Sequence, residues 1–264
     1  MNVLVARGWR SPVLNEVRLL ISWSRRELSS RYRQSAGHLV WSALQPLGVI
    51  VVYAVVFHAI LKVRGDGLPY LSFMVVGLMS WRYFANGVSQ ATCLVDQSHV
   101  IGRVYFRREI VPLSGCLTGL IDLGVGSVAM VAVATLQGIG PKLTLLALPL
   151  VYLPLILYSA AAAVFLSTIT VFLRDVGHAL PTIQQMLFLA TPIMYPVSQL
   201  PPELRFLGTV NPIAQLTESA RDVTLRGAWP DPLLLGGNTL AGGLILTGAI
   251  VYLRSIEHRI VDIG

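Results

Sequence analysis

Two charged side chains, Arg82 and Asp122, stand inside long apolar stretches of the sequence. A charge in the hydrocarbon core of a bilayer is costly, so such residues are candidates for function. Arg82 lies 14 residues into the run that begins at Leu68, and Asp122 lies 12 residues into the run that begins at Ile110. At about 1.5 Å per residue, both fall roughly 18–21 Å from their starting faces, at similar depth on antiparallel helices. Two interpretations stay open: the residues form an ion pair, or they share a polar lumen in which Arg82 meets phosphate or sugar hydroxyls.

Aromatic residues provide a second candidate surface for a substrate. Tyr53 and Phe57 are one helical turn apart, while Trp81, Tyr83 and Phe84 form a cluster. Flat aromatic faces stack on sugar rings and tolerate sliding, which suits a conduit for a sugar polymer. The alternative for each of these residues is ordinary packing between helices or against lipid.

The sequence contains no pattern for nucleotide hydrolysis. A phosphate-binding loop needs a lysine in GxxxxGK[ST], and the two lysines, Lys62 and Lys142, occur in other settings. Any ATP is therefore hydrolysed by another chain, and we expect ATP and Mg on that partner rather than a cofactor here. No nucleophile elbow and no metal-ligand spacing occurs, so no catalytic residue and no metal site are predicted. Cys93 and Cys116 are expected to be small buried hydrophobic residues.

Small residues within the third apolar run predict close helix packing. Gly115 and Gly119 are four positions apart, and Gly124, Gly126 and Ala129 match GxGxxA formally. Because the latter lie inside an apolar run rather than after a strand, we interpret them as a smooth packing face.

Composition excludes a soluble fold. Hydrophobic residues make up 54% of the 264 residues and charged residues 12%, with a mean hydropathy of +0.67. Soluble domains carry about 25% charged residues. The sequence therefore predicts an all-α integral membrane protein with one transmembrane domain over residues 1–264: a cytoplasmic segment 1–38, a membrane domain 39–253 and a tail 254–264. Six runs are long enough to span a bilayer: Leu39–Leu61, Leu68–Cys93, Ile110–Leu136, Leu143–Phe172, Leu180–Val197 and Leu233–Leu253.

The distribution of basic residues indicates the orientation of these spans. With the N-terminus inside, 13 of the 20 Lys and Arg residues fall on the cytoplasmic side, 6 fall outside and Arg82 lies within a span. This asymmetry favours both termini in the cytoplasm. It also explains the net charge of +7 without nucleic-acid binding.

Two further segments are neither spans nor simple loops. After Ser11-Pro12, one face is formed at helical spacing by Leu14, Val17, Ile21, Ser24 and Leu28, which predicts an amphipathic helix on the membrane surface or against a partner. Between the fifth and sixth spans, the segment Leu200–Trp229 predicts short re-entrant helices in the outer leaflet. In that segment, a helical stripe follows Asn211-Pro212 at Ile213, Leu216, Ala220 and Val223.

Several short motifs, in order along nearly the whole chain, resemble those of the membrane subunits of polysaccharide-exporting ABC transporters, the permeases for O-antigen, teichoic acid and galactan. The first is Arg25-Arg26-Glu27-Leu28 followed by Arg31-Tyr32-Arg33-Gln34-Ser35. Similar stretches then follow: Trp41, Gln45-Pro46-Leu47, Tyr53 with Val56-Phe57, Gly77-Leu78 with Trp81 and Phe84, Val104 to Pro112, Arg174-Asp175, Thr191 to Pro196, and Asn211-Pro212. The chain departs from the family at position 107, where it has arginine and the family commonly has proline.

The resemblance implies a homodimer in the bacterial inner membrane, joined to two copies of a nucleotide-binding ATPase subunit. It implies export of lipid-linked polysaccharide on a polyprenyl diphosphate carrier, through a conduit lined mainly by the first and fifth spans with help from the second. The residues expected to contact the ATPase are Arg31, Tyr32, Arg33, Arg103, Tyr105, Phe106, Arg107, Arg108, Glu109, Arg174 and Asp175. The residues expected along the channel are Tyr53, Phe57, Trp81, Arg82, Tyr83, Phe84, Asp122 and Tyr195.

Three other functions remain as alternatives. The nearest is an ABC permease that exports a small drug or lipid, which the Arg31-Tyr32-Arg33 block and the Thr191–Pro196 segment disfavour. A membrane-embedded glycosyltransferase or phosphatase would need metal-binding acids or a phosphate cradle in the loops. A structural membrane subunit without transport would leave Arg82 and Asp122 without a role.

Overall fold

The computed structural model describes residues 18–25, 48, 50–63, 65–97 and 107–256. Regular structure in these residues is helical, and the strand-like pairing within them is a single bridge between Gly65 and Leu68. The all-α prediction is therefore confirmed for this part of the chain.

The first half of the described chain holds residues 18–25, which are helical, and the following elements: a π-helical segment Ala54–Ile60, α3 (Tyr70–Ser89), a 3-10 turn Gln90–Thr92, α4 (Cys93–Asp96) and α6 (Ile110–Leu136). The second half begins with a 3-10 turn Leu143–Ala147, α7 (Leu148–Phe172) and α8 (Arg174–Ala190). It continues with 3-10 turns Val197–Gln199 and Pro202–Leu204, α9 (Phe206–Val210), α10 (Pro212–Arg221), a π-helical turn Asp222–Arg226 and α11 (Pro232–Ser255).

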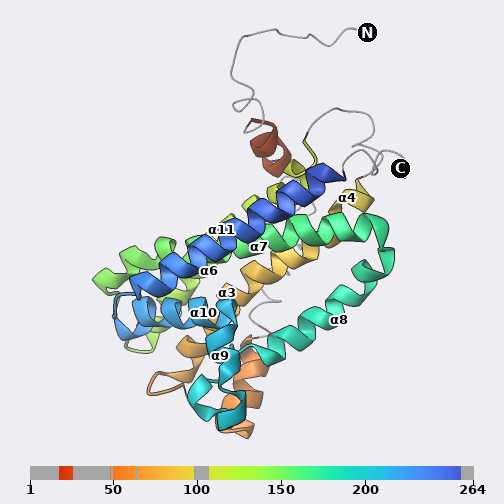
Figure 1. The fold of residues 1–264 in the computed structure, drawn as a ribbon. Helices are drawn as coiled ribbons and strands as arrows, with labels where there is room; N and C mark the ends of the chain where they lie inside the picture. The colour runs from red at the N-terminus through yellow and green to blue at the C-terminus, as the bar shows by residue number, and fades with distance from the viewer. Residues whose placement is uncertain (1–17, 26–47, 49, 64, 98–106, 257–264) are drawn as a thin grey trace.

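Helix α7 is the centre of the bundle. It contacts α11, α3, α6 and α10, and α3 in turn contacts α6 and α10. Figure 1 shows α11 and α7 running side by side, while α8 turns away from α7 at its far end. The largest cluster of buried apolar side chains is shared by α3, α6, α7 and α10.

Glycines allow α3, α6 and α7 to approach closely. A Cβ at Gly87 would lie 2.4 Å from the backbone oxygen of Ser159 on α7. On α6, a Cβ at Gly115, Gly119 or Gly126 would collide with side chains of α3 and the turn after it. The predicted packing face is therefore confirmed at these three positions, whereas Gly124 faces open space.

Three described helical segments are long and apolar enough to cross a membrane: Ile110–Leu136, Leu143–Phe172 and Pro232–Ser255. They coincide with the third, fourth and sixth predicted spans. At the second predicted span, α3 is a 20-residue helix that carries Arg82 and Asn86, which lower its hydropathy. The first predicted span lies partly outside the described residues. The six-span topology and the position of the termini therefore stay predictions.

The fifth predicted span is shifted in the structure. Helix α8 has 17 residues and runs from Arg174 to Ala190, so it begins six residues before the predicted start and ends before Thr191. Arg174 and Asp175, expected in a loop, form its first turn, and Leu173 alone separates α7 from α8. The apolar pattern missed this turn because its residues are polar although they are helical.

The predicted helical segment between α8 and α11 is confirmed as helical. Asn211 caps α10, since its side-chain oxygen accepts hydrogen bonds from the backbone N–H of Ile213 at 2.9 Å and of Ala214 at 3.4 Å. The predicted stripe of Ile213, Leu216, Ala220 and Val223 is buried. The re-entrant placement of α9 and α10 in the outer leaflet stays a prediction.

The described part of the N-terminal helix contacts the start of α6. Ser24 is buried, and its hydroxyl donates to the backbone oxygen of Leu20 at 2.9 Å and of Ser114 at 3.4 Å. Ile21, which was predicted on the same face as Ser24, is exposed. Residues 1–17 and 26–38 lie outside the described residues, so most of the predicted amphipathic helix does too.

Candidate functional site

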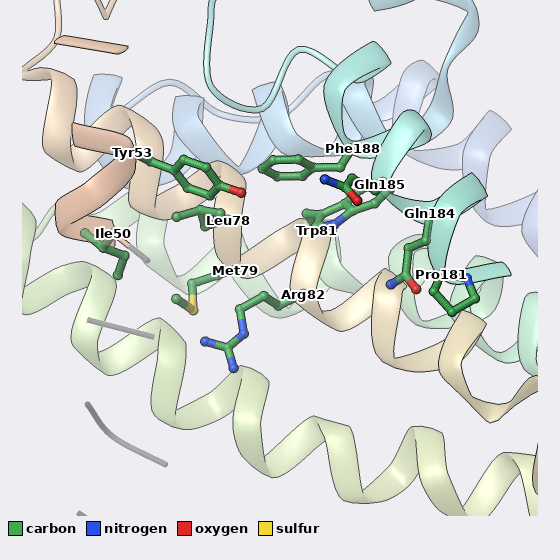
Figure 2. Close-up of a pocket in the computed structure, with 10 residues that line it drawn as sticks. All are labelled: Ile50, Tyr53, Leu78, Met79, Trp81, Arg82, Pro181, Gln184, Gln185 and Phe188. Atoms are coloured by element: carbon green, nitrogen blue, oxygen red, sulfur yellow. The ribbon is translucent and has the colours of Figure 1, made fainter. Parts of the chain in front are cut away.

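A pocket of about 340 Å³ lies between residues 50–53, α3 and α8. Figure 2 shows the rings of Tyr53, Trp81 and Phe188 together with the polar side chains that line it. The side chains that carry its chemistry are Tyr53, Trp81, Arg82, Gln184, Gln185 and Phe188. Three separate segments of the chain thus build this one pocket.

The aromatic side of the pocket is centred on Phe188 of α8. The Phe188 ring stacks on Tyr53, with 5.7 Å between ring centroids, and meets Trp81 at 5.6 Å. Phe57 meets Tyr53 edge to face at 6.1 Å, and Phe84 lies 5.7 Å from Trp81. These rings form a connected aromatic cluster, of which Tyr53, Trp81 and Phe188 line the pocket.

The polar side of the pocket is supplied by Arg82, Gln184 and Gln185. In Figure 2, the guanidinium of Arg82 extends away from the rings of Tyr53 and Phe188. The two glutamines follow Pro181, which lies inside α8 and also lines the pocket. Since proline has no N–H for the helical hydrogen bond, it weakens α8 at this wall. The pocket therefore offers amide groups for hydroxyls and one cation.

The structure brings only some of the predicted channel residues together. Tyr53, Trp81 and Arg82 line the pocket, and the rings of Phe57 and Phe84 extend its aromatic surface. Phe188, Gln184 and Gln185 were missed. The sequence signal that could have found them is a polar pair followed by an aromatic residue within the fifth predicted span, Leu180–Val197.

The remaining predicted channel residues lie elsewhere. Tyr83 is buried on another side of α3, where its hydroxyl donates to the backbone oxygen of Cys116 at 3.2 Å. Asp122 is exposed on α6. The hydroxyl of Tyr195 donates to the backbone oxygen of Leu189 at 2.6 Å. Among the ion pairs of the described residues, none joins Arg82 to Asp122.

An ion pair joins the start of α6 to the end of α11. Glu109, directly before α6, accepts hydrogen bonds from Arg254 of α11, with Nε at 3.1 Å and Nη2 at 2.5 Å from Oε1. Arg108 and Glu109 are buried, whereas Arg107 is exposed. The other residues expected to contact the ATPase either begin α8 (Arg174 and Asp175) or lie outside the described residues (Arg31, Tyr32, Arg33, Arg103, Tyr105 and Phe106).

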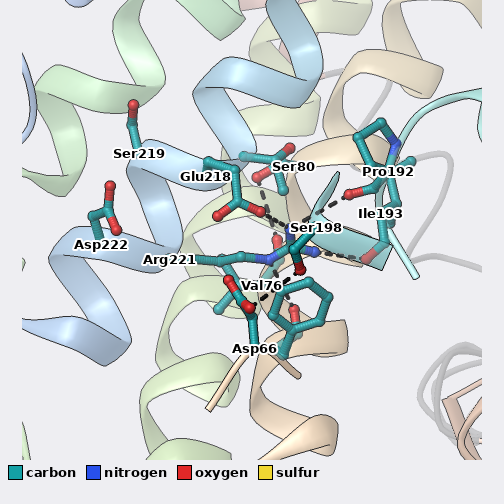
Figure 3. A network of polar contacts seen from close by, with 12 residues as sticks. Asp66, Val76, Ser80, Pro192, Ile193, Ser198, Glu218, Ser219, Arg221 and Asp222 are labelled. Carbon is teal, nitrogen blue, oxygen red and sulfur yellow. Dashed lines mark hydrogen bonds and ion pairs between the residues drawn. The ribbon is translucent and has the colours of Figure 1, made fainter. Parts of the chain in front are cut away.

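A second polar cluster surrounds the buried Arg221 at the end of α10 (Figure 3). Its guanidinium donates to the backbone oxygen of Phe73 at 3.2 Å and of Ile193 at 2.6 Å, and it pairs with Glu218. It also lies 3.5 Å from the centroid of the Phe73 ring. Gly77 leaves room for this approach, because a Cβ there would lie 2.7 Å from the guanidinium.

Arg221 remains charged in this setting. Burial lowers the pKa of Arg221 to about 10, and the carboxylate of Glu218 opposes that shift. The positive charge at neutral pH thus ties α10 both to α3 and to the segment that follows α8.

Arg226 extends the Arg221 cluster toward the loop before α3. It bonds to Asp222 at 2.7 Å and Glu218 at 3.1 Å, and it lies 3.7 Å from Asp66. Asp66 accepts a hydrogen bond from Ser198 at 3.2 Å. Four segments therefore meet at this end of the bundle: the loop before α3, α3 itself, the segment after α8, and α10.

The fold and these sites define a class of protein: a helical membrane protein whose pocket is built between helices, as a transporter requires. The chain belongs to the ABC-2 type transporter family, whose model matches residues 18–225. It is therefore a membrane permease of the ABC transporter class.

Its similarity to curated relatives extends over most of the chain. It is 28% identical over 216 residues to the O-antigen export system permease protein RfbA of Myxococcus xanthus, which covers 81% of this chain and 82% of that protein. It is 24% identical over 212 residues to the O-antigen export system permease protein RfbA of Klebsiella pneumoniae, which covers 79% of this chain and 81% of that protein.

Proposed function

We propose that this chain is the permease subunit of an ATP-driven exporter that moves lipid-linked polysaccharide, carried on a polyprenyl diphosphate, across the bacterial inner membrane. Its similarity to two permeases named for O-antigen export supports this proposal. The structural observation that carries it is the gathering of Tyr53, Trp81 and Phe188 from three separate segments around one pocket.

The pocket suits a substrate that must bind and then move on. Stacking on an aromatic face depends little on rotation or on which sugar is present, so it guides a polymer without fixing it. Gln184 and Gln185 add hydrogen bonds to hydroxyls, which break and reform as the chain advances. Two copies of this subunit, with their pockets toward a shared path, form the conduit in our proposal.

ATP hydrolysis belongs to a separate partner, present in two copies. The sequence has no phosphate-binding loop, so the energy reaches this chain through contact. The segment around Arg107 to Glu109 is a suitable receiver, because Glu109 connects the start of α6 to Arg254 at the end of α11. A push on this segment would move two long helices together.

Deletion of the gene tests the export function. The proposal predicts that lipid-linked glycan accumulates inside the cell while the polymer disappears from the surface, and that a plasmid copy restores both. Normal surface polymer in the deletion strain would contradict the polysaccharide substrate. In that case, loss of resistance to a drug, or a changed lipid distribution, would favour a small-molecule exporter.

A further inference from the structure

The described lining of the pocket between residues 50–53, α3 and α8 carries a net positive charge. Among the ten described residues that line it, Arg82 is the one basic residue and none is acidic. Leu78, Met79 and the aromatic rings make up most of the remaining surface. The Arg82 side chain is exposed, so an anion that enters the pocket can reach its guanidinium.

Within the described residues, Arg82 has no carboxylate partner. The ion pairs within the described residues are formed by Arg221, Arg226 and Arg254, which bind carboxylates at the two ends of the bundle. The planar guanidinium of Arg82 is therefore available to the pocket, and its fork of N–H donors matches a carboxylate or a phosphate.

The other side chains of the pocket fit the rest of a sugar residue. Tyr53, Trp81 and Phe188 contribute aromatic rings to the lining, while Gln184 and Gln185 contribute amide groups for hydroxyls. A neutral sugar would offer Arg82 no counter-charge. An acidic group would add a charge-assisted hydrogen bond, which is about twice as strong as a neutral one.

We propose that this pocket binds the exported glycan at an anionic group, and that Arg82 is the residue that selects for the charge. The inference rests on the proposed export function and adds the chemical class of its substrate. The anion is either a carboxylate on a sugar of the polymer or a phosphate of the carrier lipid, since both match the guanidinium.

Fluorescence titration of the full-length chain, in complex with its ATPase, tests this proposal. The probes are hexagalacturonate, its fully methyl-esterified form, and farnesyl diphosphate. Trp81 lies in the pocket and reports binding, and the Trp81→Phe variant assigns the signal to it. The two hexasaccharides share one backbone and differ in charge, so their comparison isolates the contribution of the anion.

We expect hexagalacturonate or farnesyl diphosphate to bind at least about tenfold more tightly than the esterified hexasaccharide. Arg82→Gln should abolish this preference, Arg82→Lys should retain part of it, and Arg205→Gln, at an exposed site outside the pocket, should leave it unchanged. If Arg82→Gln weakens the binding of hexagalacturonate, the anion is a carboxylate on a sugar. If it weakens the binding of farnesyl diphosphate, the anion is the phosphate of the carrier lipid.

Two results would overturn the inference. The first is that the charged and esterified hexasaccharides bind equally and that Arg82→Gln does not change the binding of farnesyl diphosphate. This result would show that the pocket does not select for charge. The export function would stand in that case, because a neutral glycan would still occupy the pocket. The second is that no probe changes the fluorescence of Trp81, which would show that the pocket does not bind an anion. The deletion strain would then test the export function separately.

Discussion

At the scale of single residues, Arg221 shows how a charge can organise one end of an apolar bundle. Its side chain is fully buried, and its donors are distributed over Phe73, Ile193 and Glu218. These partners come from three segments, so one guanidinium holds α3, α10 and the segment after α8 in register. Lysine could not reproduce this arrangement, since it lacks the planar fork of donors.

Arg221→Met should destabilise the protein strongly. The substitution removes the donor to the backbone oxygens of Phe73, Pro192 and Ile193, and it leaves Glu218 with Arg226 alone. We expect a loss of about 3–5 kcal/mol in the free energy of unfolding. Thermal denaturation in detergent would show this as a lowered Tm, with Arg221→Lys in between. Lys62→Met, at an exposed site, should leave Tm nearly unchanged. A wild-type Tm for Arg221→Met would show that the cluster is not stabilising.

Glu109 and Arg254 form the corresponding contact at the other end. Glu109→Gln should lower the free energy of unfolding by about 1–3 kcal/mol, because the buried side chain loses its charge-assisted hydrogen bonds. The exchange of both charges tests the coupling in a double-mutant cycle. The loss in the double variant, Glu109→Arg with Arg254→Glu, should be smaller than the sum of the losses in the two single variants. Strictly additive single effects would mean that the two side chains are not coupled.

The sequence could not have indicated these contacts. Arg221 and Phe73 are separated by 148 positions, and Arg254 and Glu109 by 145, so only the tertiary fold reveals them. The same holds for Phe188, which meets Tyr53 and Trp81 from distant segments. In contrast, Trp81 and Arg82 were identifiable, because an aromatic residue beside a charge is conspicuous within an apolar run.

At the scale of helices, the hydropathy pattern predicted the bounds of a helix where the helix consists of one long apolar run. The ends of α6 agree with the prediction, since Ile110–Leu136 is a long apolar run in which Asp122 is the one charged residue, and its neighbours are polar. The start of α8 was placed too late, because its first five residues include Arg174, Asp175 and His178. Residue polarity locates membrane segments, whereas helices also extend through polar turns.

Close packing between α3 and α7 depends on Gly87. Gly87→Ala would place a Cβ 2.4 Å from the backbone oxygen of Ser159, so the two helices must separate. We expect a loss of about 1–3 kcal/mol in the free energy of unfolding. The matched control is Gly124→Ala on α6, where a Cβ meets nothing within 4 Å. There the higher helix propensity of alanine should stabilise slightly, and equal effects of the two variants would contradict this packing.

At the scale of the whole molecule, the predicted topology places the connection between α6 and α7 outside and the end of α11 inside. Gly140→Cys should therefore react with a membrane-impermeant thiol reagent in intact cells, and Ser255→Cys only after permeabilisation. Both sites are exposed, and the native Cys93 and Cys116 are buried, so background labelling should be low. Labelling of both variants from the same side would contradict the topology.

The central claim is that the exported polysaccharide passes the aromatic pocket. Surface polymer should be measured in cells whose only copy of this gene carries Trp81→Ala or Phe188→Ala, with Phe165→Ala as control. Phe165 pairs with Tyr252 outside the pocket, 6.2 Å between centroids. We expect surface polymer to fall at least about tenfold in both pocket variants, since each lost stacking contact is worth roughly 1 kcal/mol or more beyond area burial. Surface polymer is compared at equal membrane levels of the protein, because Trp81 and Phe188 are also buried in the core and their loss destabilises the fold. The control should export normally. Wild-type export by both pocket variants would contradict the account.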